Sequence, residues 1–207
     1  MFLSLFILLE NNKLCNLNQL ISTFFTGNKI KEFKNFFDKQ GIEVKSLLDF
    51  SDIDIEETGK TFIENALIKA RTIAKLTGEN VIADDSGLEV FSLNNEPGIY
   101  SARYAGIPKD DNKNIDKLLK ELDQEKNRGA RFVCALALVL ATGQEITTTG
   151  YLNGEILNKR VGNSGFGYDP VFYIPSLNKT MAEITTDEKN EVSHRANAFK
   201  KLSKKME

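Results

Sequence analysis

Two acidic pairs stand out as candidates for metal and phosphate chemistry. Residues 84–87 read Asp-Asp-Ser-Gly and directly follow a short apolar run at 81–83, and a second pair, Glu56 and Glu57, lies earlier in the chain. Carboxylates at the tip of a strand, with a small hydroxyl beside them, suit a hard cation such as Mg²⁺ that must be held against a phosphate chain. The pattern therefore predicts metal-assisted phosphoryl hydrolysis. The same residue types also form ordinary turns, and the tetrapeptide taken alone favours a turn.

A candidate phosphate-binding segment lies near the N-terminus. Residues 26–28 read Thr-Gly-Asn, follow an apolar stretch at 21–25, and precede Lys29, Lys31 and a helical pattern. A strand that turns through glycine into a helix directs backbone N–H groups and the positive helix end toward the turn, where an anion can bind. The sequence lacks the P-loop, dinucleotide, zincin and esterase signatures, so this segment is not one of those well-known sites.

A glycine-rich loop could bind a flat ligand. Residues 165–170 read Gly-Phe-Gly-Tyr-Asp-Pro. Glycines on both sides of Phe166 let the backbone approach a base, and stacking on the ring would contribute about 1–3 kcal/mol. The alternative is that the aromatic residues anchor a tight turn in the core.

The single histidine, His194, precedes Arg195 and lies five residues after Lys189. These groups could bind the acceptor edge of a base or the charge of a phosphate. The alternative is a packed or solvated helical histidine. Residues five apart do not share a helix face, so a ligand common to Lys189 and His194 would require a break in the helix or approach from different sides.

Composition narrows the class of protein. The 207 residues carry a formal net charge of −2, which offers no general attraction to a nucleic-acid polymer. Cys15 and Cys134 have no Cys or His partner at metal-ligand spacing and are too few for a disulfide framework, so we expect a reducing, cytoplasmic location. The apolar run at residues 2–9 is too short to span a membrane, and we interpret residues 1–20 as an N-terminal extension of unknown role.

Hydrophobic periodicity predicts an α/β domain over residues 21–207. A strand, a helix capped at Thr61 and ending near Gly78, and another strand follow one another in the first half. The continuously apolar segment 131–140 favours a buried central strand, and the threonine-rich alternation at 145–154 favours its antiparallel partner. The other expected elements are strands at 21–25, 81–83 and 171–174, a helix at 114–122, and a closing helix that starts near 185–188 and contains Val192, Ala196 and Phe199.

Five blocks, taken together, make the sequence recognisable. They are residues 57–66, 82–88, 97–106, 165–170 and 193–195, and the match extends in order from Thr26 to Leu202. Together they closely resemble the noncanonical purine nucleoside triphosphate pyrophosphatases, the inosine/xanthosine triphosphate pyrophosphatase family. The resemblance implies a mixed α/β fold with a long central sheet, flanking helices and two lobes with a nucleotide cleft between them. It also implies a homodimer that hydrolyses ITP, dITP and XTP to the monophosphate and pyrophosphate with Mg²⁺.

The resemblance also implies roles for particular residues. Glu57 and Asp85 match the metal-binding acids, and Asp85 also matches the catalytic proton acceptor. Whether Glu56 or Asp84 shares the metal stays open. The substrate-binding positions implied are Thr26, Gly27, Asn28, Lys29, Ile30, Lys31, Ser86, Phe166, Gly167, Tyr168, Asp169, Lys189, His194 and Arg195.

Two rival functions remain at this point. A nucleotide-binding sensor could keep the pocket without turnover, although carboxylates near a triphosphate repel it unless a metal is present. A phosphatase with an aspartate nucleophile is the second rival. Such enzymes use two aspartates separated by one residue, whereas Asp84 and Asp85 are adjacent.

Overall fold

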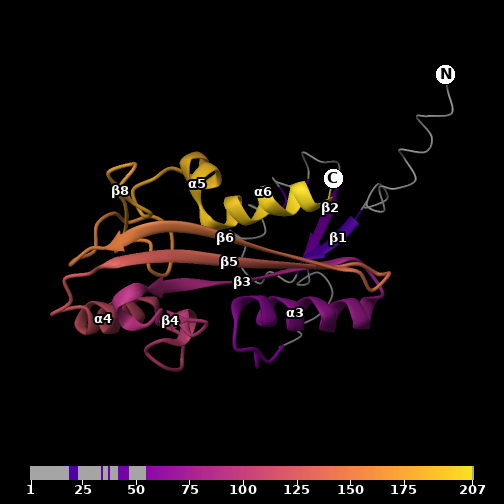
Figure 1. Cartoon of the computed structure of the whole chain (residues 1–207), viewed down its shortest axis with the longest axis horizontal. Coiled ribbons are helices and arrows are strands. Elements are labelled where there is room, and N and C mark those ends of the chain that lie inside the picture. Colours follow the sequence, from indigo (N-terminus) through magenta and orange to yellow (C-terminus); the bar gives the residue numbers. More distant parts are fainter. Residues whose placement is uncertain (1–18, 23–33, 35–36, 38–41, 47–54, 207) are drawn as a thin grey trace, which may run out of the picture.

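A twisted mixed sheet forms the centre of the molecule (Figure 1). The computed structural model describes residues 19–22, 34, 37, 42–46 and 55–206 of the chain. Within them, eight strands form one sheet in the order β2-β1-β3-β5-β6-β7-β8, with β4 paired to β3. The contacts of β1 with β2 and β3 are parallel and the other pairings are antiparallel. The strands are β1 (Gln19–Ser22), β2 (Glu43–Ser46), β3 (Val81–Val90), β4 (Pro97–Gly98), β5 (Gly129–Val139), β6 (Glu145–Ile156), β7 (Phe172–Ile174) and β8 (Lys179–Thr180).

Helices cover both faces of this sheet (Figure 1). Helix α3 (Phe62–Thr77) lies on one side, and α5 (Thr186–Val192) and α6 (His194–Met206) lie on the other. Helix α4 (Asp111–Glu121) packs near one end of the sheet, in a cluster with Leu88, Val90 and Phe132. Two 3₁₀ turns, η2 (Phe91–Leu93) and η3 (Ser101–Arg103), flank β4. The predicted mixed α/β fold is confirmed, as are the buried central strand β5 and its antiparallel partner β6.

Strand β3 corrects the prediction for residues 84–87. These residues were expected at a strand tip or in a turn after a strand at 81–83, but β3 continues to Val90. The reason is pairing: β5 matches β3 residue by residue from Val81 opposite Val139 to Val90 opposite Ala130. Backbone hydrogen bonding to a long apolar neighbour outweighs the turn preference of Asp, Ser and Gly, so the acids lie in mid-strand.

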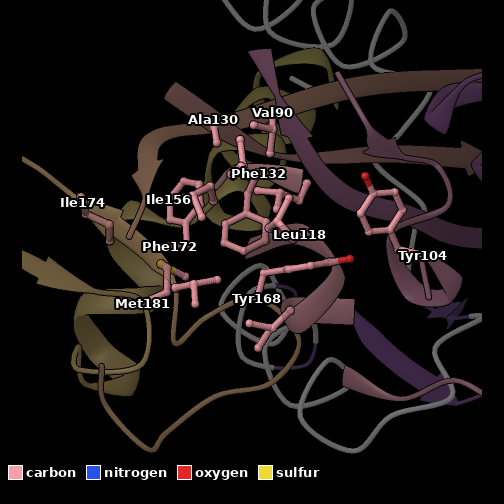
Figure 2. Close-up of a cluster of buried hydrophobic side chains, with 14 of the residues drawn as sticks. Val90, Tyr104, Leu118, Ala130, Phe132, Ile156, Tyr168, Phe172, Ile174 and Met181 are labelled. Carbon is pink, nitrogen blue, oxygen red and sulfur yellow. The ribbon is translucent and has the colours of Figure 1, made fainter. Parts of the chain in front are cut away.

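Alternation along β3 and β5 gives the sheet two apolar faces. Val81 and Ala83 belong to the cluster that α3 covers, whereas Ile82 belongs to the cluster under α6. A third cluster lies toward α4 and β7, where the rings of Phe132 and Phe172 lie 4.3 Å apart between centroids (Figure 2). Both faces of β5 are therefore buried, which explains why its sequence is apolar at nearly every position.

Helix α3 begins as the sequence predicts. The Thr61 hydroxyl accepts a hydrogen bond from the Glu64 amide, and Gly78 ends the helix in the left-handed region at φ 71°. The reciprocal half of the predicted capping box is shifted by one residue, because the Glu64 carboxylate accepts from the amide of Lys60 rather than that of Thr61.

The expected single closing helix is instead two helices. Ser193 adopts an extended conformation, with φ −63° and ψ 156°, and this residue separates α5 from α6. Thr185 and Glu188 form a complete capping box at the start of α5. The break lies between Lys189 and His194, and it is one of the two arrangements that would let a ligand contact both residues.

The N-terminal predictions are tested only in part. Strand β1 begins at Gln19, so the last two residues assigned to the N-terminal extension belong to the sheet, and residues 23–25 of the expected strand lie outside the described residues. The predicted phosphate-binding positions 26–31 also lie outside them. No helix within the described part of the chain is long and apolar enough to cross a membrane.

Candidate active site

The two acids singled out in the sequence, Glu57 and Asp85, meet at one ammonium group. Lys69 Nζ lies 2.7 Å from Glu57 Oε1 and 3.4 Å from Asp85 Oδ1. Arg103 Nη1 lies 3.8 Å from the other oxygen of Glu57. Segments far apart in the sequence therefore bring two carboxylates together at the side of β3 that faces α3.

Helix α3 positions this cluster through residues one turn apart. Asn65 and Lys69 lie at i and i+4, so both side chains point from the same helix face toward β3. The Asn65 side-chain oxygen accepts a hydrogen bond from the Gly59 amide at 2.8 Å, which leaves its NH₂ group to donate to Asp85 Oδ2 at 3.1 Å. Asn65 thus joins the segment that carries Glu57 to the strand that carries Asp85.

Asp84 lies on the opposite face of the strand. Its Oδ2 accepts a hydrogen bond from the Ser86 hydroxyl at 2.8 Å and lies 3.8 Å from Arg195 Nε. Adjacent strand residues point to opposite faces, so Asp85 faces α3 and Asp84 faces α6.

Burial and nearby negative charges raise the pKa of Asp85. Burial raises its pKa to about 6, and the neighbouring carboxylates Glu57 and Asp84 add to the rise, while Lys69 and Asn65 oppose it. Burial would lower the pKa of Lys69, but attraction to Asp85, Asp84 and Glu57 outweighs it, and the pKa is raised. Lys69 lies within 4 Å of both Glu57 and Asp85, so these two carboxylates share one ammonium group.

This cluster fits a hard divalent cation. Glu57 and Asp85 supply carboxylate oxygens, the ligand type that Mg²⁺ prefers, and Mg²⁺ commonly takes only one or two protein carboxylates together with phosphate oxygens and waters. Among the described residues, no group of three or more His, Cys, Asp or Glu side chains is placed to hold a metal by itself. The two acids would therefore hold a cation together with a phosphorylated ligand.

A cavity of about 300 Å³ begins at the residues of β3 that follow Asp85; Glu57, Asp85 and Lys69 are not among the residues that line it. Ser86 and Gly87 of β3 form part of its wall, directly after Asp85. The cavity is lined by Ser86, Gly87, Leu88, Ser101, Ala102, Lys109, Asp111, Phe132, Phe166, Gly167, Tyr168, Asp169, Lys189, His194 and Arg195. All seven predicted substrate-binding residues from Phe166 onward, together with Ser86, are thus brought to one cavity.

The glycine-rich loop is anchored in this cavity by its own side chains. Asp169 Oδ2 accepts hydrogen bonds from Lys189 Nζ at 2.7 Å and from the Phe166 amide at 3.1 Å. The Tyr168 hydroxyl donates to the Ser101 carbonyl at 3.0 Å, and this tyrosine is buried. Phe166 remains 38% exposed, so its ring is available for stacking. The interpretation of Tyr168 as a core anchor and that of Phe166 as a stacking surface are both compatible with this geometry.

Cationic and aromatic groups surround that ring. Lys189 Nζ and the Arg195 guanidinium lie 5.2 and 5.6 Å from the Phe166 centroid. His194 is buried and stacks on Phe132, with 5.0 Å between ring centroids. This end of the cavity therefore offers an aromatic face and several N–H donors.

Close packing of α6 on β6 fixes the position of His194 and Arg195. A Cβ at Gly150 would fall on the His194 carbonyl oxygen and the Ala198 amide nitrogen, so only glycine permits this approach. The Thr148 hydroxyl donates to the Ala198 carbonyl at 3.1 Å and adds a polar link.

The sequence analysis missed several residues of the site, namely Asn65, Lys69, Ser101, Lys109 and Asp111. A signal existed for the first two, because they are polar residues on the apolar stripe of a predicted helix, and Asn65 is fully buried. Ser101 lies in one of the recognised blocks but carried no assigned role. Lys109 and Asp111 gave no signal, since a charged pair at a helix start is ordinary.

Comparison with known proteins gives consistent matches. The model of the Ham1 family matches residues 22–205. A dITP/XTP pyrophosphatase of Bacillus subtilis is 50% identical over 191 residues, which cover 91% of this chain and 96% of that protein. One from Bacillus cereus is 47% identical over 196 residues, covering 92% and 96%. The solved structure of the Staphylococcus aureus Ham1 protein superposes with a TM-score of 0.85 at 44% identity, covering 91% of this chain and 97% of that one.

Proposed function

The chain belongs to the Ham1 family, and from that premise we propose that it hydrolyses noncanonical purine nucleoside triphosphates such as ITP, dITP and XTP to the monophosphate and pyrophosphate. One observation carries the proposal beyond the family match. Glu57 and Asp85 come together at Lys69, and the two residues that follow Asp85, Ser86 and Gly87, line a cavity shared with Phe166, Lys189, His194 and Arg195. A carboxylate cluster at one end and an aromatic, donor-rich pocket at the other suit the phosphate and base ends of a nucleotide.

Asp85 is the group best placed to accept a proton. Water that attacks the α-phosphorus must lose a proton, and a base with a pKa near the operating pH does this best. Burial brings the pKa of Asp85 to about 6, and the hydrogen bond from Asn65 fixes one of its oxygens. The other oxygen faces Lys69, which balances part of the charge that gathers when the triphosphate binds.

Glu57 and Asp85 would hold Mg²⁺ together with the substrate. When bound, the cation neutralises charge on the phosphate oxygens in the transition state. The predicted phosphate-binding positions 26–31 would stabilise the leaving pyrophosphate, with the Lys31 ammonium group supplying positive charge. These positions lie outside the described residues, so this role stays a prediction.

His194, Arg195 and nearby backbone N–H groups explain a preference for 6-oxo purines. These donors would satisfy the oxygen of hypoxanthine or xanthine, but they would face the amino group of adenine. Each buried donor left unpaired costs about 1–3 kcal/mol. Guanine also carries a 6-oxo group, so this argument discriminates against ATP and not against GTP.

Three features of the proposal rest on the family resemblance and on composition. They are a homodimeric assembly, two lobes around the nucleotide, and a cytoplasmic location. Light scattering on the purified full chain tests the first, since a mass of one chain would contradict it.

Product analysis of nucleotide hydrolysis tests the proposed function. The purified chain is incubated with ITP, dITP, XTP, GTP or ATP, with and without Mg²⁺. We expect IMP and pyrophosphate from ITP, little turnover of ATP, and loss of activity without Mg²⁺. Inorganic phosphate as the first product would indicate the phosphatase alternative, and nucleotide binding without any product would indicate a sensor.

A further inference from the structure

The start of helix α4 contacts the glycine-rich loop directly. Asp111, the first residue of α4, accepts a hydrogen bond on its Oδ2 from the Gly167 amide at 2.9 Å. Lys109 Nζ lies 3.6 Å from the other oxygen of the same carboxylate. Both side chains line the cavity, although neither belongs to the blocks that made the sequence recognisable.

The hydrogen bond from Gly167 fixes a peptide that would otherwise have freedom to move. Gly167 adopts φ 58°, and no atom lies within 4 Å of the position that a Cβ would occupy. Glycine is needed there for its backbone conformation, and packing does not confine the residue. The peptide between Phe166 and Gly167 carries the exposed ring at one end and donates to Asp111 at the other. Restraining that peptide restrains the ring.

The remaining anchors of the loop act on other atoms. Asp169 accepts from the Phe166 amide and from Lys189, and the Tyr168 hydroxyl reaches the Ser101 carbonyl. Asp111 adds a restraint from a separate element, helix α4, and acts on the Gly167 amide. The position of the Phe166 ring relative to Lys189 and Arg195 therefore depends on α4 as well as on α5 and α6.

Hydrogen bonds to neighbouring segments hold the start of helix α4 in place, so Asp111 has a fixed position from which to restrain the loop. The Asp110 carboxylate caps it by accepting from the Lys113 amide at 3.0 Å. The Asn114 side chain accepts from the Ala105 amide at 2.7 Å and donates to the Ala102 carbonyl at 3.1 Å, which ties α4 to η3 and to the cavity wall.

We propose that Asp111 is a positioning residue for base recognition: by holding the Gly167 amide it sets where the Phe166 ring and the adjacent donors lie, and so contributes to selection among purine bases. This inference rests on the proposed function. The carboxylate touches the loop and acts through it, so its loss alters the fit of the base more than the chemistry at the phosphates.

Three variants of the full chain test the role. Asp111→Ala removes the acceptor, Asp111→Asn keeps an acceptor oxygen without the charge, and Asp116→Ala removes an exposed α4 carboxylate that pairs with Arg160 at 2.8 Å. Steady-state kinetics with ITP and ATP, and equilibrium binding of ITP without Mg²⁺, are measured for each. For Asp111→Ala we expect KM for ITP to rise about tenfold, as for loss of a charge-assisted hydrogen bond, and the preference for ITP over ATP to fall by a similar factor. kcat changes little.

The two matched variants separate positioning from general stability. We expect Asp111→Asn to recover most of the preference, and Asp116→Ala to stay within about twofold of the parent, as ordinary surface substitutions do. An Asp111→Ala variant that lowers kcat alone, or slows ITP and ATP hydrolysis equally, would overturn the proposal. A parent protein that releases no pyrophosphate from ITP would instead refute the proposed function, and the positioning role would then be decided by whether Asp111→Ala weakens ITP binding.

Discussion

Replacing Asp85 with Asn should make the protein more stable while it removes activity. Asn has nearly the same shape as Asp, and its side-chain oxygen can still accept the hydrogen bond from Asn65. What disappears is a buried negative charge whose pKa is raised by burial and by the nearby carboxylates Glu57 and Asp84, against the opposing effects of Lys69 and Asn65. Burying such a charge opposes folding, as is common at sites kept for function.

The raised pKa gives the size of the effect. A rise from 3.8 to about 6 means that ionising Asp85 in the folded protein costs about 3 kcal/mol more than in the unfolded chain. Between these two pH values the folded state keeps a proton that the unfolded state has lost, so stability falls as pH rises through the window and stays reduced above it. Asp85→Asn carries no such cost. We expect it to exceed the parent by about 3 kcal/mol at pH 8, roughly 6–12 °C in Tm, and to match the parent near pH 4.

Urea unfolding in EDTA at several pH values from 4 to 8 measures this difference without metal. Asp116→Asn, an exposed carboxylate in an ion pair with Arg160, is the matched control and should show no comparable gain. Turnover of ITP with Mg²⁺ should fall by about 10²–10⁴-fold, the usual contribution of a general base. A stability gain that is absent at pH 8, or equal at pH 4 and pH 8, would refute the account of Asp85 as a destabilised buried carboxylate. Undiminished turnover would refute its catalytic role.

Three further substitutions test other parts of the site. Lys69→Met should lower the free energy of unfolding by about 3 kcal/mol at pH 8, measured in urea, because Glu57 and Asp85 lose the ammonium group that they share. A variant as stable as the parent would mean that Lys69 does not balance these carboxylates. Gly150→Ala should lower the free energy of unfolding by about 1–3 kcal/mol or more and raise KM for ITP, because the new methyl group displaces α6. A Tm equal to that of the parent would contradict the close packing of α6 on Gly150. Phe166→Ala should raise KM for ITP about tenfold with kcat nearly unchanged, from lost stacking, and an unchanged KM in steady-state kinetics would show that the base lies elsewhere.

The parts of the fold that sequence predicted correctly are those that one local pattern determines. Strand β5 is apolar along its length because both faces are covered, and β6 alternates because one face meets α6. Helix α3 carries its own cap at Thr61 and its own stop at Gly78. In each case the residues that signal the element are also the residues that stabilise it.

The errors arose where a distant partner decides the structure. Residues 84–87 have turn propensity, but pairing with β5 keeps them extended. Nothing in the local sequence around Ser193 marks a break, since the helical pattern continues through it; α6 must instead start at His194 to pack against Gly150. Lys69 was missed because a lysine on a helix is normally a solvated surface residue, and only the fold shows that it points at two carboxylates.

The mid-strand position of the two aspartates places their side chains on opposite faces of the sheet, which the sequence spacing could not show. At a strand tip or in a turn, both side chains could have reached the same ligand, and the roles of Asp84 and Asp85 would stay interchangeable. Within a strand they must diverge, so Asp85 joins Glu57 and Lys69 on one face while Asp84 meets Ser86 and Arg195 on the other. Strand alternation thus places one acid with Glu57 and Lys69 and the other with Arg195, which lines the cavity, although the two acids are adjacent residues of β3.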